Sequence, residues 1–257
     1  MNRATLPLWV LSGLLVLGVI VVMIVGRGCF GTTASALKEH GARVEARVSA
    51  VRAVAEDMRT QPFVTDGAMD FDGAGVAVTF GRTRADATGL VIHEEDLAHL
   101  DELGAVFARV PQTKVVAECT AILEHRTHPW DPLEPTRWTS TLDGSFSKAV
   151  FERCEAAKYL LVVRTLELVR PSVLGKECAH TPCKFSSGHV RGEVHLYSLD
   201  PVKHHGAALF EAESSENASI SLGTEVDLAH ASARSIAASV TALAPKATFD
   251  TSSMNDE

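Results

Sequence analysis

The stretch YLLVVRTLELV, from Tyr159 to Val169, decides the fold. Its core, Leu160 to Val163, is an unbroken run of apolar residues rather than an alternation of apolar and polar ones. Such a run is typical of a strand that is buried on both of its faces. We therefore predict a central strand of a sheet over residues 159–169.

A second strand is predicted over residues 188–199, where apolar and polar residues alternate. Val190, Val194 and Leu196 lie toward one face. The opposite face is polar and carries Arg191, Glu193 and His195. This alternation predicts a strand with one buried face and one polar face.

The two strands of a β-hairpin are expected to meet after Leu199. Asp200-Pro201 begins a turn that Gly206 ends, and residues 207–213 return as the partner strand. This arrangement places His204 and His205 at an exposed hairpin tip.

Helical and strand patterns alternate along the rest of the body. We predict helices over residues 93–109, 146–158 and 222–243, and short strands over 76–80 and 114–123. Local strand pairs interleaved with helices favour an α+β fold, a two-layer domain with a mainly antiparallel sheet packed against helices. In element order, the second half is similar to periplasmic lipoprotein domains that activate cell-wall synthases or assemble secretion pores. This resemblance concerns architecture alone and carries over no functional residue.

A long helix is predicted from Ala34 to Thr60, before Pro62. Its apolar positions alternate three and four residues apart, which is a heptad pattern. They are Leu37, Gly41, Val44, Val48, Val51, Ala55 and Met58. This apolar face suits packing within the chain, a plain stalk, or a homodimer through the juxtamembrane helix, and Gly41 and Ala55 weaken the dimer.

An apolar stretch near the N-terminus, Leu6 to Gly26, predicts a membrane span. It contains no charged residue and lies between Arg3 and Arg27. As a helix it reaches about 32 Å, close to the thickness of a bilayer core. We expect an uncleaved signal anchor, because the stretch is longer than the apolar region of a cleaved signal peptide. A cleaved signal peptide and a lipid-modified Cys29 are the alternatives.

The chain is therefore expected to have four parts. They are a signal-anchor transmembrane helix (1–27), a juxtamembrane amphipathic helix or stalk (28–61), an α+β extracytoplasmic domain (62–245) and a polar disordered tail (246–257). The charges that flank the span are nearly balanced, so they do not decide which side the domain faces.

The cysteines decide the orientation instead. Cys119, Cys154, Cys178 and Cys183 form an even set in the body, which favours an oxidising compartment outside the cytoplasm. Cys178 and Cys183 are near enough in sequence to close a local loop, which leaves Cys119 and Cys154 to join distant elements. Four cysteines allow three pairings, and reduced buried thiols are the alternative. The favoured location is the cytoplasmic membrane, single-pass, with the C-terminal domain outside.

Two groups of residues have the composition of metal ligands. Cys178, His180, Cys183 and His189 combine the sulfur and imidazole ligands that zinc accepts, but their spacing fits no zinc finger, so a disulfide loop is favoured. The second group, in one loop, is His125, His128, Asp131 and Glu134. Prolines recur every three residues in that loop, which predicts an extended segment holding Trp130 and Trp138 for packing or for a partner. No metal or cofactor is assigned.

Charge and motifs limit the function. Setting Arg3 and Arg27 aside, 22 basic and 32 acidic residues give the body a formal charge of −10, which argues against nucleic acid as a partner. No nucleophile elbow, Walker loop, dinucleotide glycine motif or HExxH helix occurs, so no catalytic residue is assigned. We expect a binding or structural module of the cell envelope, whose partner is another envelope protein. A membrane-anchored hydrolase or metal-dependent enzyme is the alternative.

Overall fold

The computed structural model describes residues 33–80, 87–98, 144–174, 184–214 and 224–251. None of the helices in these ranges is long and apolar enough to cross a bilayer, and the predicted span lies outside them. The elements are α2 (Thr33–Met58), β1 (Ala68–Met69), β2 (Ala77–Thr79), β3 (Gly89–His93), α3 (Glu94–Ala98), α6 (Gly144–Ala156), β4 (Tyr159–Val169), β5 (Ser172–Leu174), β6 (Lys184–Ser186), β7 (His189–Leu199), β8 (Val202–Glu213), α7 (Thr224–Leu243) and β9 (Thr248–Asp250).

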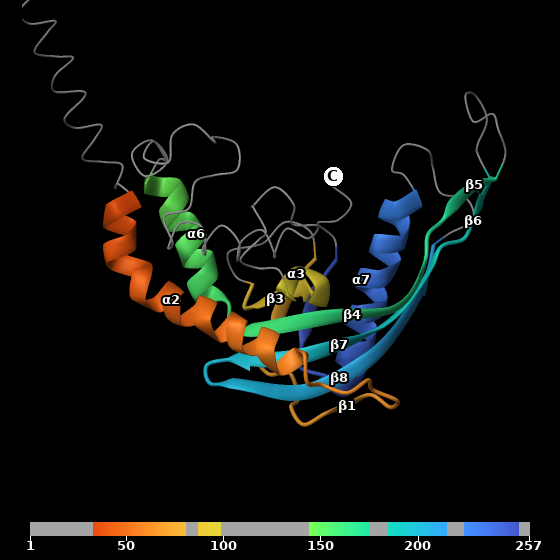
Figure 1. The fold of residues 1–257 in the computed structure, drawn as a ribbon, viewed down its shortest axis with the longest axis horizontal. Helices are drawn as coiled ribbons and strands as arrows, with labels where there is room; N and C mark the ends of the chain where they lie inside the picture. The colour runs from red at the N-terminus through yellow and green to blue at the C-terminus, as the bar shows by residue number, and fades with distance from the viewer. Residues whose placement is uncertain (1–32, 81–86, 99–143, 175–183, 215–223, 252–257) are drawn as a thin grey trace, which may run out of the picture.

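Seven strands form one curled sheet in the order β1-β8-β7-β4-β3-β2-β9 (Figure 1). β4 is the middle strand, which confirms the prediction made from its apolar run. The sheet is mixed rather than mainly antiparallel in its strand pairs. β1, β8, β7 and β4 pair antiparallel, whereas β4, β3, β2 and β9 pair parallel. The α+β class is confirmed.

The sheet is covered on both faces, so the predicted two-layer arrangement is wrong. On one face, Leu161 and Val163 of β4 lie in the same apolar cluster as Ile236 and Val240 of α7. On the other face, Leu160 and Val162 join a cluster to which α2 and α3 contribute. The α2 and α3 members of that second cluster are Ala50, Val51, Val54, Met58 and Leu97. Successive β4 residues point to opposite faces, so its unbroken apolar run requires this third layer.

The heptad face of α2 is buried within the chain. Val44, Val48, Val51 and Met58 are each at most 4% exposed. The helix packs along α6 and then runs onto the sheet, as Figure 1 shows. Glu155 of α6 bonds both His40 and Arg43 of α2. The C-terminal half of the predicted stalk therefore belongs to the core of the domain.

The β7–β8 hairpin turns earlier than predicted. The strands are separated by Asp200 and Pro201 alone, and Gly206 lies inside β8 with a φ of 116°. A register shift between Leu196 and Tyr197 places a bulge beside it. His204 and His205 therefore belong to β8 and not to an exposed hairpin tip. The bulge allows the polar residues that follow Pro201 to pair with β7.

Two further predictions need correction. Residues 89–93 form β3 and the helix begins at Glu94, whereas the predicted helix began at His93 and its remainder lies outside the described residues. Residues 248–250, assigned to a disordered tail, form β9, which pairs parallel with β2. Both strands are too short for a sequence period to distinguish them from other structure.

We expect Ser235→Ala to destabilise the outer edge of β8. Ser235 of α7 donates a hydrogen bond to the Glu211 carbonyl at 2.6 Å and accepts one from the Glu211 N–H at 3.3 Å. Loss of both bonds is expected to lower the free energy of unfolding by about 1 kcal/mol, measured by urea denaturation. Ser239→Ala on the same helix is the matched control for the change in helix propensity. Equal effects at the two serines would contradict this role.

Candidate functional site

Most residues singled out from the sequence lie outside the described residues. They are Cys119, Cys178, Cys183, Trp130, Trp138, His125, His128, Asp131, Glu134 and His180. Cys154 is described, and it is 2% exposed on the inner side of α6. His189, the fourth member of the predicted zinc group, lies 2.9 Å from the Glu211 carboxylate. The zinc group, the partner surface and the disulfides stay predictions.

We expect two disulfides among Cys119, Cys154, Cys178 and Cys183. Alkylation of the natively isolated protein, followed by mass measurement with and without reductant, is expected to show all four thiols blocked until reduction. Peptide mapping then identifies the pairing. Because Cys154 is buried, its partner has to reach the inner side of α6. Four alkylated thiols before reduction would contradict both the bridges and the oxidising compartment.

The acidic residues before β2 bind basic side chains of this chain. The Asp70 carboxylate accepts hydrogen bonds from Lys203 at 2.8 Å and His205 at 3.1 Å, and these bonds lower the pKa of Asp70. Asp72 accepts a hydrogen bond from Lys246 at 2.6 Å, which lowers the pKa of Asp72. The two carboxylates therefore attach the β1 segment to β8 and to the turn after α7. Among the described residues, no three His, Cys, Asp or Glu side chains are grouped as a metal site.

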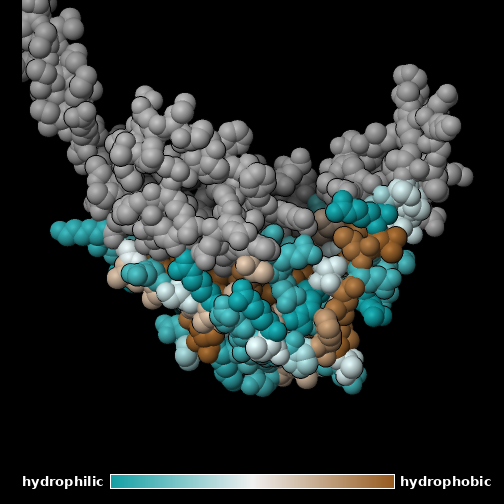
Figure 2. Space-filling model, viewed as in Figure 1, coloured by the Kyte–Doolittle hydropathy of each residue, from teal (hydrophilic) through white to brown (hydrophobic). Residues whose placement is uncertain are grey.

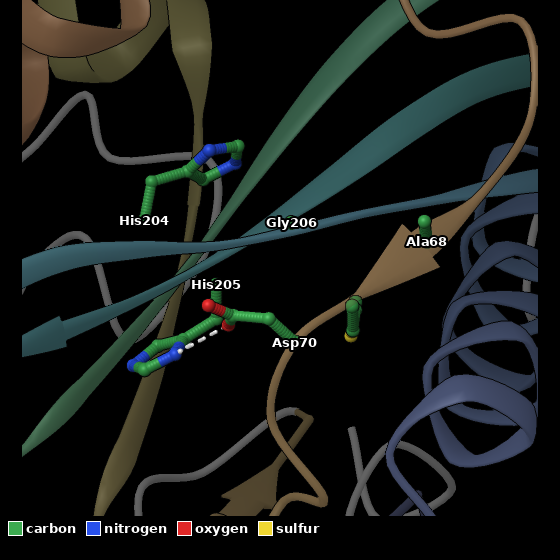
Figure 3. A pocket seen from close by; sticks show the side chains of 6 residues that line it. Ala68, Asp70, His204, His205 and Gly206 are labelled. Carbon is green, nitrogen blue, oxygen red and sulfur yellow. Dashed lines mark hydrogen bonds and ion pairs between the residues drawn. The ribbon is translucent and has the colours of Figure 1, made fainter.

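A shallow depression lies where β1 meets β8. It has a volume of about 360 Å³, is widely open to solvent, and is lined by Ala68, Met69, Asp70, His204, His205 and Gly206. Figure 3 shows the Asp70–His205 hydrogen bond and places the two histidine rings on opposite sides of β8. The His205 ring packs on Phe71 with centroids 4.7 Å apart. An open depression of this shape does not enclose a small molecule in the way that ligand pockets do.

Among the described residues, a group of bonded polar side chains is centred on Arg164 of β4, beside the C-terminal end of α2. Arg164 follows the apolar run of β4 on the face that α2 covers, and its side chain is 9% exposed. Its guanidinium holds the Glu94 carboxylate with two hydrogen bonds, of 2.7 and 2.9 Å. It also donates to the carbonyls of Met58 at 2.9 Å and Gln61 at 3.2 Å. Arg164 therefore supplies donors to the backbone carbonyls at the C-terminal end of α2.

Glu193 extends this arrangement across β7. Its carboxylate is fully buried and lies 3.3 Å from an Arg164 nitrogen. It accepts hydrogen bonds from the Val64 N–H at 2.6 Å and from His195 Nε2 at 3.1 Å. The other ring nitrogen of His195 lies 3.2 Å from Nε2 of His204. One line of hydrogen bonds thus runs from β8 through β7 to the segment after α2.

A second set of contacts holds the same end of α2. The Tyr197 hydroxyl donates to Asp57 at 2.8 Å, and Gln61 donates to the same oxygen at 2.7 Å. Phe63 lies over the Arg164 guanidinium, 5.2 Å from ring centroid to Cζ, and is otherwise 72% exposed. We name the set Arg164, Glu94, Glu193, His195, His204, Tyr197 and Asp57 the α2 anchor cluster.

Burial and hydrogen bonding shift the pKa values of four residues of this cluster, Arg164, His195, His204 and Tyr197. The hydrogen bond to Glu94 is the main cause that raises the pKa of Arg164, which keeps it charged. Burial is the main cause that lowers the pKa of His195 and of His204. Burial, followed by the bond to Asp57, raises the pKa of Tyr197. At neutral pH the cluster therefore combines a charged Arg164 with neutral imidazoles.

The α2 anchor cluster has the chemistry of a structural attachment. Within the described residues, its charged groups bond one another, neighbouring side chains and backbone groups. The sequence prediction missed the cluster because Glu193 and His195 lie on the polar face of an alternating strand, which indicates solvent unless another layer covers it. The available signal was Arg164, a charge inside an apolar strand, since buried charges need partners.

No family model, curated protein or solved structure matches this chain. The architectural likeness to periplasmic lipoprotein domains therefore stays an expectation.

Proposed function

We propose that this chain is a single-pass protein of the cytoplasmic membrane whose α+β domain lies outside the cytoplasm and acts as a binding or structural module of the cell envelope. The observation that carries the proposal is the attachment of α2, the helix that follows the candidate span, to the sheet through the α2 anchor cluster. A helix fixed in this way makes the segment that follows the candidate span a part of the domain.

The exposed surface supports a binding role. β4 carries three exposed apolar side chains beyond Arg164, namely Leu166, Leu168 and Val169, with exposed fractions of 36%, 49% and 50%. Figure 2 shows apolar residues gathered on the side of the molecule where the long strands lead toward β5 and β6. Apolar side chains gathered on a protein surface often mark contacts with another protein. The partner that fits this surface is an envelope protein.

Protease accessibility tests the location. In sealed spheroplasts, added protease is expected to degrade the domain while a cytoplasmic control protein stays intact. The undigested protein is expected to sediment with membranes and to dissolve only in detergent. A domain that stays protected in spheroplasts, or a mature chain in the supernatant that starts well after Met1, would overturn the proposed location.

Site-specific photo-crosslinking in intact cells tests the binding role. A photoreactive residue at Leu168 is expected to give a discrete adduct that mass spectrometry identifies as an envelope protein. The matched control is the same residue at Thr241, which is exposed on α7. Absence of an adduct at Leu168, or the same adducts at both positions, would contradict binding at this surface.

A further inference from the structure

The pair His195–His204 carries an inference beyond the proposed function. The two rings are stacked with centroids 5.3 Å apart, and His195 Nδ1 lies 3.2 Å from His204 Nε2. The His195 side chain is 1% exposed, whereas His204 is half-buried and also packs on Tyr197 at 4.7 Å. A direct bond between two imidazoles depends on where their hydrogens are.

The neighbouring groups determine which ring nitrogens of the two histidines carry a hydrogen. His195 Nε2 faces the Glu193 carboxylate, which only accepts, so this nitrogen carries a hydrogen and donates. Nδ1 of a neutral His195 then has a lone pair and accepts from Nε2–H of His204. If both rings were fully protonated, two N–H groups would face each other and the bond would be lost. The closed pair therefore holds at most three ring hydrogens, whereas a separated pair holds four.

Titratable groups on α2, α3, β4, β7 and β8 act on the pair. Glu193 and Glu94 favour a charged His195, and Arg164 opposes it. Asp57 favours a charged His204, whereas His195 and His205 oppose it. Burial is the largest influence on each ring and opposes the charged form. A protonated, half-buried His204 is therefore better accommodated in solvent than against His195.

Direct hydrogen bonds connect the histidine pair to the C-terminal end of α2. His195 bonds Glu193, Glu193 bonds the Val64 N–H, and Arg164 joins Glu193 to the carbonyls of Met58 and Gln61. We propose that His195 and His204 form an acid-sensitive link, which holds the C-terminal end of α2 against the sheet at neutral pH and releases it when both rings are protonated. Because opening takes up at least one proton, acid favours the released state.

Acid is expected to destabilise the closed pair. Each histidine has an ordinary pKa of 6.5 and a lower pKa when folded. The opened chain therefore binds more protons at mildly acidic pH. The stabilisation is fully present above the ordinary histidine pKa and is lost as the pH falls from that value through the lower pKa of the folded state.

Hydrogen–deuterium exchange of the full chain in detergent tests the link. Rates at pH 7.5 and 5.5 are corrected for intrinsic exchange. Peptides covering residues 57–66 are expected to open up to about tenfold more per pH unit for each proton taken up. Peptides of α7, on the other face of the sheet, are expected to keep their protection. An unchanged 57–66 segment, or an equal increase in α7, would overturn the proposal.

Two variants connect the response to the pair. His204→Gln keeps an N–H donor but cannot be protonated, so the dependence of residues 57–66 on pH is expected to fall. His230→Gln on α7 is the matched control and is expected to respond like the parent chain. An unaltered pH response in His204→Gln would contradict the link. A nuclear magnetic resonance titration of the parent chain gives an independent measurement, and it would overturn the proposal if neither His195 nor His204 titrated below the ordinary histidine pKa of 6.5.

Discussion

Arg164→Met is expected to lower the free energy of unfolding by about 3 to 5 kcal/mol, the usual cost of removing one partner from a buried charge network. Methionine fills a similar volume but donates nothing, so the carbonyls of Met58 and Gln61 lose their donor. Glu193, which is fully buried, loses its positive partner. Glu94 is 32% exposed and can turn to water, so the largest penalty falls on Glu193. Urea denaturation followed by circular dichroism measures the loss.

The matched control is Arg191→Met. Arg191 is an exposed arginine of β7, so the same chemical change there is expected to alter stability by no more than about 0.5 kcal/mol. A loss below about 1 kcal/mol in Arg164→Met would show that the α2 anchor cluster does not fix α2.

A second substitution separates the effect of the lost hydrogen bonds from the effect of leaving the Glu193 charge unpaired. Glu193→Gln removes the buried negative charge, so the double variant Arg164→Met/Glu193→Gln is expected to lose less stability than the sum of the single changes, by about 0.5 to 3 kcal/mol. Additive losses would show that Arg164 and Glu193 do not act together. The cycle therefore tests the Arg164–Glu193 pair itself and not merely the fit of the methionine side chain.

Some elements were predictable because their evidence is local. The bounds of β4 agree with the predicted strand at both ends, and the predicted helices over 146–158 and 222–243 correspond to α6 and α7. Each contains enough consecutive residues for a period or a run to be distinct. The central place of β4 followed from the same run, because a strand that is buried on both faces lies away from the sheet edges. The same burial requires a layer on each side of the sheet, which the predicted two-layer arrangement did not include.

The parallel part of the sheet was not predictable in this way. β3 is five residues long and β9 is three, and each pairs with a strand far away in the sequence. A run of that length fits many structures, and its strand partner decides which one forms. The candidate site was hidden for a related reason: the polar face of β7 is covered by α2, which lies more than a hundred residues earlier in the chain.

Gly206→Ala is expected to destabilise the protein by about 3 kcal/mol, because a side chain there meets both backbone strain and a steric overlap. Gly206 has a φ of 116°, a region that residues with a Cβ rarely adopt. An added Cβ would overlap the Ala68 carbonyl oxygen and lie 2.9 Å from the Met69 Cα. Since Met69 pairs with Gly206, β1 has to move away from β8. Urea denaturation measures the global loss, and faster hydrogen exchange over residues 66–72 is expected to accompany it.

Gly41→Ala is the matched control, because the same added methyl group there is expected to have the opposite effect. Gly41 lies within α2, and apart from its chain neighbours and the backbone of α2 itself, no atom lies within 4 Å of an added Cβ. Alanine is the better helix former, so Gly41→Ala is expected to stabilise the protein by about 0.5 to 1 kcal/mol. Opposite signs at the two glycines would show that the backbone of β8, rather than the methyl group itself, causes the loss. If Gly206→Ala cost less than about 1 kcal/mol, the bulge would tolerate a side chain, and the backbone would not be what keeps His204 and His205 on opposite sides of β8.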